Sequence, residues 1–160
     1  YFKYKIVWEK SKSTNFLNAK KQPLRKHEDI CIFYKNQPLY NPQMTEGHTP
    51  VHSYTKHTTD GSCYGETKIG ISGGGSTQRY PRDVLQFKWD TQKSSFHPCQ
   101  KPLEACEYFI KTYTNEGDLV LDNCMGSGTT GLACKNLNRR FIGIEKEEKY
   151  FEIAKERIRI

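Results

Sequence analysis

The chain has 160 residues, a length typical of one domain or of part of one. Its 25 lysines and arginines outnumber its 18 acidic residues, and the formal net charge of +7 suits a polyanionic partner without establishing one. Hydrophobic residues make up only 35% of the sequence, which is low for a domain built on a buried parallel sheet. No apolar run reaches the roughly 20 residues that span a bilayer, so we expect no membrane partner.

The six cysteines are widely spaced, and none of them forms a Cys-x-x-Cys pair. This spacing favours a reduced, cytoplasmic protein over a disulfide framework. Three histidines and one cysteine occur close together at His48, His52, His57 and Cys63. Structural zinc sites usually contain paired cysteines, and we therefore predict a surface loop and no metal in this region.

The first third of the chain contains two strand-like segments, Tyr1–Trp8 and Glu28–Tyr34. We predict that they pair as neighbours at one edge of a sheet. The residues between them, Ser11 to Lys26, are polar and basic. Two interpretations stay open for this stretch: a solvated loop, or a loop that contacts phosphates through its lysine, arginine and asparagine side chains.

The middle of the chain, residues 36–90, is rich in loop-forming residues. Pro38 and Pro42 end regular structure, and polar, glycine-rich sequence follows from Gly47 to Gly75. The segment Arg79-Tyr80-Pro81-Arg82 precedes a short strand-like run. Its arginines are suited to recognition of bases or phosphates, and a simple surface turn is the alternative.

A βαβ unit is predicted near the C-terminus. An apolar strand, Leu119–Asp122, enters a glycine-rich turn, a helix starts near Thr129, and a second apolar strand, Phe141–Glu145, follows. One amphipathic helix is predicted before this unit, starting at Pro102, and another after it, from about Glu147. The turn lies at the carboxyl end of the first strand, where open α/β sheets bind ligands.

The residues of this turn favour a nucleoside ligand. Gly126, Gly128 and Gly131 form a G-x-G-x-x-G pattern, and Glu145 follows at close to the spacing of about 20 residues expected for an acid that binds ribose hydroxyls. A dinucleotide site and a tight turn without a ligand are the alternatives. A phosphate-binding P-loop is disfavoured because no Gly-Lys-Ser/Thr follows the turn.

Several motifs together resemble those of the S-adenosylmethionine-dependent DNA amino-methyltransferases. They are His97-Pro98-Cys99-Gln100-Lys101-Pro102, then Asp122–Thr130, then Phe141–Glu145 with Tyr150. The order is similar to that of the circularly permuted group, in which the catalytic motif precedes the cofactor motif. The upstream segments Trp8–Lys10, Asn15–Asn18, Arg25–Glu28 and Arg79–Arg82 also resemble the family. A dinucleotide site would predict nothing at residues 97–102 and is disfavoured for that reason.

The resemblance implies an α/β, Rossmann-like methyltransferase fold. Residues 1–35 would supply edge strands, residues 36–90 a loop-rich target-recognition insertion, and residues 91–160 the S-adenosylmethionine-binding βαβ portion. The implied cofactor residues are His97, Gln100, Lys101, Pro102, Asp122, Asn123, Met125, Gly126, Ser127, Gly128, Thr129, Thr130 and Glu145. The predicted DNA contacts are Lys20, Lys21, Arg25, Arg79 and Arg82.

The sequence departs from the family pattern in two places. Asn123-Cys124 stands where the family usually has Pro-Phe, which weakens the packing expected against the cofactor. The family's catalytic motif, Asp/Asn/Ser-Pro-Pro-Tyr/Phe, holds the amino group of a flipped base, and no Pro-Pro occurs in this sequence. We therefore predict no catalytic residue in this chain. The motif and the central strands of an incomplete sheet are expected before Tyr1, and residues 1–160 alone are expected to be inactive.

The function implied by the resemblance is methylation of an exocyclic amine in double-stranded DNA whose target base is flipped out, as in restriction-modification systems. Adenine N6 is the first choice of target, and cytosine N4 is the alternative. A non-catalytic remnant that binds DNA or cofactor and a nicotinamide dehydrogenase are the competing interpretations. The oligomeric state is not indicated by the sequence.

Overall fold

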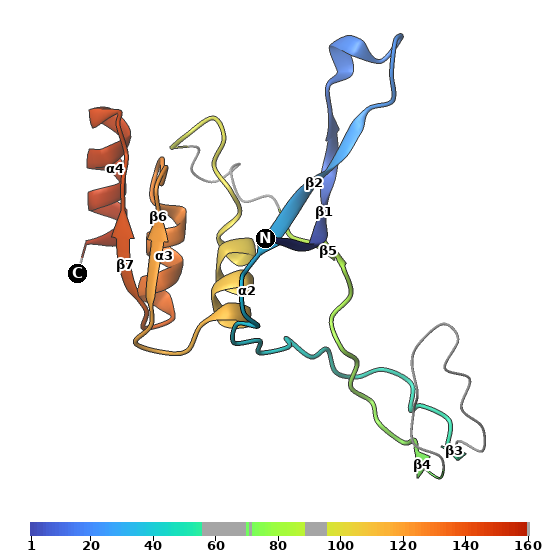
Figure 1. Cartoon of the computed structure of the whole chain (residues 1–160). Coiled ribbons are helices and arrows are strands. Elements are labelled where there is room, and N and C mark those ends of the chain that lie inside the picture. Colours follow the sequence, from blue (N-terminus) through green and yellow to red (C-terminus); the bar gives the residue numbers. More distant parts are fainter. Residues whose placement is uncertain (56–69, 71, 89–95, 160) are drawn as a thin grey trace. The chain divides into compact units, whose positions relative to one another are not determined.

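The computed structural model describes residues 1–55, 70, 72–88 and 96–159, which divide into two compact units (Figure 1). Unit 1 comprises Tyr1–Pro42 and Arg82–Ile160, and unit 2 comprises Gln43–Pro81. The second unit is therefore narrower than the insertion predicted at residues 36–90. None of the described helices is both long and apolar enough to cross a membrane.

The first sheet of unit 1 is a long hairpin with a third strand beside it. Strand β1, Phe2–Thr14, pairs antiparallel with β2, Arg25–Phe33, and parallel with β5, Val84–Gln86. The predicted pairing of the two N-terminal segments is confirmed. The strand order is β2-β1-β5, so Val84–Gln86 belongs to this sheet and not to the second unit.

The hairpin extends further than the sequence predicted. The pairing continues past Glu9, which lies opposite His27, to Thr14, which lies opposite Arg25, with an irregularity between these pairs. Only the tip is a non-strand connection, containing a short 3-10 helix at Phe16–Asn18. The prediction of a loop over residues 11–26 is therefore wrong at both ends, because residues 11–14 belong to β1 and residues 25–26 to β2. Backbone pairing and cross-strand contacts, which alternation of apolar residues does not reveal, extend polar strands in this way.

Helix α2, Leu103–Tyr113, packs against two apolar clusters of unit 1. One cluster joins its Ala105 to Trp8 of β1 and to Phe87, which follows β5. The other joins its Ile110 to buried residues of the C-terminal portion. Both described apolar clusters thus use α2, which begins at Leu103, one residue after the predicted start at Pro102.

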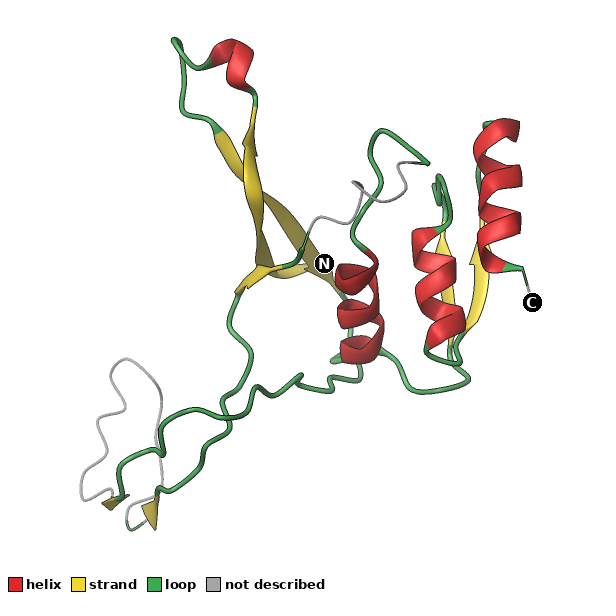
Figure 2. Cartoon of the chain, turned by 180° about the vertical axis from the view of Figure 1, so that it is seen from behind, coloured by secondary structure: helices red, strands yellow, loops and turns green. Residues whose placement is uncertain are grey.

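The C-terminal portion is the predicted βαβ unit followed by a helix. Strands β6, Leu119–Asp122, and β7, Arg140–Gly143, pair in parallel, and α3, Thr129–Asn136, connects them. The last helix is α4, Glu148–Ile158. Figure 2 shows α3 and α4 in front of the two strands when the chain is seen from behind. Asn138 has a φ of 57°, the left-handed conformation that ends a helix.

The opposite face of the two-stranded sheet is apolar and exposed. Leu119 is 50% exposed, Leu121 63%, Ile142 48% and Ile144 54%, whereas Val120 and Phe141 pack against the second cluster. Among the described residues β6 pairs only with β7, and the two sheets of unit 1 are separate. The incomplete sheet expected from the sequence stays a prediction, and the first group of strands has a third member in β5.

Unit 2 contains little regular structure in its described residues. Strands β3, Tyr54–Thr55, and β4, Ser72–Gly73, form a short antiparallel pair. The guanidinium of Arg79 donates hydrogen bonds to the carbonyls of Ser76 at 2.9 Å and of Thr49 at 2.5 Å. Arg79 therefore joins separate loops of this unit. His57 and Cys63, considered above as metal ligands, lie outside the described residues.

Alanine substitutions at two glycines distinguish the cost of backbone strain from the cost of overpacking, as both appear in the free energy of unfolding. Gly128 has a φ of +76°, and a Cβ added there would lie 2.8 Å from Cβ of Ala154. Gly117 has a φ of +81° and no atom within 4 Å of such a Cβ. Alanine at either site costs about 1–2 kcal/mol of backbone strain, and only Gly128→Ala adds overpacking of about 1–3 kcal/mol. We expect urea unfolding to show the larger loss for Gly128→Ala, and equal losses would contradict the close contact of α3 and α4.

Candidate functional site

The loop between β6 and α3 is fastened to the strand that follows it. The N–H of Met125 donates to the carbonyl of Ile144 at 3.0 Å, and the N–H of Ile144 donates to the carbonyl of Asp122 at 2.9 Å. Gly126 and Gly128 have φ values of 51° and 76°, which few residues other than glycine adopt. The sequence thus folds into a turn whose backbone faces the carboxyl ends of two parallel strands, the usual ligand-binding position in such sheets.

Asp122, at the end of β6, fixes both ends of this loop. One carboxylate oxygen accepts the backbone N–H of Cys124 at 3.1 Å, and the other accepts the hydroxyl of Thr130 at 2.7 Å. Thr130 lies in the first turn of α3. The side chain therefore joins the strand end to the helix N-terminus, whose free N–H groups favour polar or anionic ligand groups.

Glu145 supports the same loop from the end of β7. Its carboxylate accepts the N–H of Gly126 at 2.8 Å and the N–H of Glu147 at 2.9 Å. The hydrogen bond from Glu147 and, after it, that from Gly126 hold the pKa of Glu145 below its usual value despite the opposing effect of burial. Its predicted contact with ribose hydroxyls stays a prediction. Its structural role in the loop was not expected from the sequence.

A cavity of about 320 Å³ lies at this loop. The predicted cofactor residues that line it are His97, Gln100, Lys101, Asp122, Met125, Gly126, Ser127, Thr129 and Thr130. The other four predicted cofactor residues, Pro102, Asn123, Gly128 and Glu145, do not line it. The cavity thus joins two segments, residues 97–101 and 122–130, that are separated in the sequence by helix α2.

Three cysteines that are not among the predicted cofactor residues also line the cavity: Cys99, Cys106 and Cys124. Cys106, on α2, also packs against the second cluster. Cys124 stands where the family usually has an aromatic residue. Its position directly after the loop's Asp122-Asn123 was the one signal that could have placed it in the site.

The segment from Phe96 to Pro102 forms the opposite wall. The ring of His97 packs edge-on against the ring of Tyr150 with centroids 4.3 Å apart, and its Nδ1 accepts the N–H of Cys99 at 3.0 Å. The side chain of Gln100 is only 7% exposed, and its Oε1 accepts the hydroxyl of Ser127 at 3.3 Å. This hydrogen bond connects the wall directly to the loop.

Helix α4 contributes a contact that the sequence did not indicate. Arg157 donates to the carbonyl of Ser127 at 2.5 Å and to its hydroxyl at 2.9 Å, while its guanidinium lies 5.0 Å from the centroid of the Phe96 ring. Arg157 lies in the last turn of α4, where a positive charge also suits the helix dipole. Its contacts hold the loop and the wall from one side.

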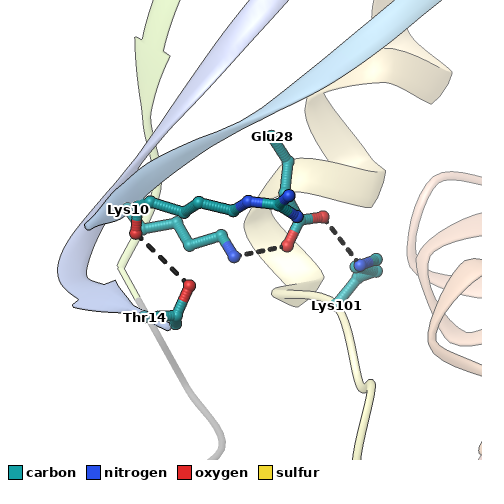
Figure 3. Close-up of polar contacts among 5 residues, drawn as sticks. Lys10, Thr14, Glu28 and Lys101 are labelled. Carbon is teal, nitrogen blue, oxygen red and sulfur yellow. Dashed lines mark hydrogen bonds and ion pairs between the residues drawn. The ribbon is translucent and has the colours of Figure 1, made fainter. Parts of the chain in front are cut away.

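Lys101 connects the wall to the N-terminal hairpin. Figure 3 shows the carboxylate of Glu28, on β2, between the ammonium groups of Lys10 and Lys101. The distances from the two nitrogens to Glu28 oxygens are 2.7 Å for Lys10 and 2.8 Å for Lys101. Burial alone would raise the pKa of Glu28, but the hydrogen bonds from Lys10 and Lys101 outweigh it and hold the pKa below its ordinary value.

The predicted DNA-binding cations fall into two groups. Lys20, Lys21, Arg25 and Arg82 are exposed, and the first three lie in or beside the tip of the hairpin. Arg79 is half-buried and donates its hydrogen bonds to backbone carbonyls of unit 2. Among the residues that the structure describes, no group of three His, Cys, Asp or Glu side chains could hold a metal ion.

Comparison with known proteins matches residues 1–156 to a family model described as DNA methylase, which covers the N6 and N4 types. The type II methyltransferase M2.DpnII of Streptococcus pneumoniae is 52% identical over 62 residues, 39% of this chain and 23% of that enzyme. The type II methyltransferase M.BglII of Bacillus subtilis is 31% identical over 153 residues, 94% of this chain and 40% of that enzyme. The chain therefore spans well under half the length of these relatives.

Several solved structures resemble the chain. The crystal structure of the M1.HpyAVI-SAM complex has a TM-score of 0.61 and 31% identity, covering 99% of this chain and 63% of that one. The cytosine-N4-specific PvuII DNA methyltransferase has a TM-score of 0.63 at 17% identity, covering 96% of this chain and 49% of that one. The second likeness shows the fold alone. The chain belongs to the S-adenosylmethionine-dependent DNA amino-methyltransferase family, whose members have a Rossmann-like fold.

Proposed function

We propose that this protein methylates an exocyclic amine of a base in double-stranded DNA at a specific site, with S-adenosylmethionine as the methyl donor. The observation that carries the proposal is that residues of the wall and of the loop Asp122–Thr130 line one cavity together. Adenine N6 is the first choice of target and cytosine N4 the alternative. Mass spectrometry of nucleosides from treated DNA distinguishes the two products.

The residues of the cavity suit S-adenosylmethionine. Its volume of about 320 Å³ lies in the range of small-molecule sites, roughly 300–1,000 Å³. In this proposal the loop wraps the methionine end, Glu145 binds the ribose hydroxyls, and the wall closes the pocket. The cofactor supplies a methyl group activated by its positively charged sulfur. The protein's task is then to hold that methyl group in line with the amine, which needs alignment more than a strong base.

Target recognition and catalysis are assigned to different parts of the protein. We assign recognition to the loop-rich residues 36–90, which include unit 2. The target base would be flipped out to reach the cofactor. The motif that holds its amino group has no counterpart in this sequence, and we propose that sequence before Tyr1 supplies it.

The same additional sequence would complete the sheet. The exposed face formed by Leu119, Leu121, Ile142 and Ile144 is apolar, and β6 has one edge without a strand partner among the described residues. A parallel sheet of this class is normally covered on both faces. Central strands that pair with β6, and helices that cover this face, would satisfy both requirements and would account for the low hydrophobic content of the chain.

Cofactor binding has a direct chemical test in the full-length protein. Cys99 and Cys124 are exposed and line the cavity, whereas Cys31 is exposed on β2 and serves as the internal control. We expect S-adenosylmethionine to slow alkylation of the first two thiols and to leave Cys31 unaffected, as measured by peptide mass spectrometry. Glu145→Ala should shift the protection midpoint by about tenfold or more, because hydrogen bonds to a charged group are removed. Glu148→Ala, at the start of α4, is the matched control. Equal protection at all three thiols would contradict the assignment of this cavity as the S-adenosylmethionine site.

DNA binding should depend on salt through the exposed cations. Neutralising Lys20, Lys21, Arg25 and Arg82 together with glutamine should reduce the slope of log K against log salt by about 0.9 for each phosphate that the protein no longer neutralises. Arg79→Gln is measured separately, since this substitution also removes hydrogen bonds within unit 2. Neutralising Lys3 and Lys5, on β1, provides a control with unchanged binding expected. An unaltered slope in the fourfold variant would mean that these residues form only a solvated surface.

An assay of methyl transfer tests whether residues 1–160 are sufficient for catalysis. We expect residues 1–160 alone to give no incorporation of tritiated methyl groups into DNA, and the full-length protein to give incorporation, because the motif that orients the amine lies outside this chain. A mixture of the 160-residue chain with separately expressed preceding sequence should restore part of the activity. Incorporation by residues 1–160 unaided would overturn this assignment.

A further inference from the structure

Glu28 occupies a position between a buried charge and the cofactor pocket. The residue Lys10 is only 8% exposed. A buried ammonium is strongly unfavourable without a nearby carboxylate, and Glu28 supplies one at 2.7 Å. The second oxygen of the same carboxylate accepts Lys101 at 2.8 Å. Lys10 therefore fixes Glu28 on the hairpin, and Glu28 in turn faces the pocket wall (Figure 3).

The wall is held from two sides by neighbouring residues. Gln100 accepts the hydroxyl of Ser127, which belongs to the cofactor loop. Lys101 points to the hairpin, where it also lies 5.8 Å from the centroid of the Trp8 ring. The next residue, Pro102, is buried and precedes α2. The segment therefore spans the distance between hairpin and loop, and Glu28 is its charged anchor on the hairpin.

The Lys101 contact matters more for position than for stability. The side chain of Lys101 is 53% exposed, and an ion pair so open to water contributes little to the free energy of folding. Its carboxylate partner is nevertheless fixed, because Lys10 is buried beside it. An ammonium held in one place keeps the wall in one conformation and lowers the entropy lost when a ligand enters the pocket.

We propose that Glu28 is a positioning residue for the cofactor pocket, acting through Lys101 and itself held by Lys10. The inference rests on the proposed function, since it concerns the same S-adenosylmethionine site. Loss of Glu28 should weaken cofactor binding about two- to fivefold, the scale of an ion pair that is partly open to water. The rate at saturating cofactor should stay within about twofold, because Glu28 does not line the cavity.

The experiment must distinguish two roles of Glu28: positioning of the pocket wall through Lys101, and neutralisation of the buried Lys10 charge. Glu28→Gln in the full-length protein removes the negative charge that pairs with Lys10 and the one that holds Lys101. We expect a lower melting temperature from the first loss and a higher KM for S-adenosylmethionine from the second. Lys10→Met/Glu28→Gln removes the buried charge as well, and a methionine retains most of the lysine stem. This double variant should recover the melting temperature while keeping the raised KM and an almost unchanged kcat.

Two further variants complete the set. Lys101→Met alone should raise KM at least as much as the double variant does, because Lys101 lines the cavity in addition to pairing with Glu28. Asp29→Asn, which breaks the exposed ion pair with Lys5 on the same hairpin, should leave both KM and melting temperature near wild type.

The outcomes distinguish this inference from the function on which it rests. A wild-type protein that binds no S-adenosylmethionine would overturn the proposed function. A wild-type protein that binds it, with Lys10→Met/Glu28→Gln binding equally well, would overturn only the positioning role and leave Glu28 as the counterion of Lys10. A raised KM that persists in the double variant, with the melting temperature restored, supports the inference.

Discussion

The structure of unit 1 depends on one helix that packs on two sides. Helix α2 contributes Ala105 to the cluster around Trp8 and Phe87, and Ile110 to the cluster around Ala133 and Cys134. Its first residue directly follows the pocket wall. Any change in the packing of α2 therefore moves the wall relative to the loop. Because each cluster has only three buried members among the described residues, the position of the wall rests on few side chains, and the surrounding polar contacts have a correspondingly large part in fixing it.

Those polar contacts converge on the loop. Asp122 and Glu145 each accept two hydrogen bonds, three of the four from backbone N–H groups, and Arg157 adds donors from α4. The backbone conformation is thus set by protein groups before any ligand enters. Preorganisation of this kind reduces the conformational cost of binding. Asp122 and Glu145 are acids of the kind that bind nucleosides, and they also hold the loop that would surround the ligand. Their substitution therefore affects the structure of the loop and the affinity for the ligand together.

Much of this arrangement was predictable from the sequence, because its signals are local. The strand, turn, helix and strand from Leu119 to Gly143 follow from apolar runs and glycine positions, and the pocket from two motifs on either side of α2. The rest depends on contacts between distant residues. The pairing of polar residues up to Thr14, the reach of Arg157 to Ser127 and the bridge from Glu28 to Lys101 leave no periodic pattern. Sequence spacing indicates which segments meet, but not which side chains join them.

The thiols of the pocket have a consequence for the redox behaviour of the protein. Cys99 and Cys124 are both exposed at the cavity, in contrast to Cys134, whose burial raises its pKa to about 11 and suppresses the reactive thiolate. Oxidation to a sulfenic acid, or capping by glutathione, would add bulk and polarity where a ligand must fit. Under the proposed function, such a modification would block the pocket reversibly, while the buried Cys134 of the second apolar cluster would stay reduced.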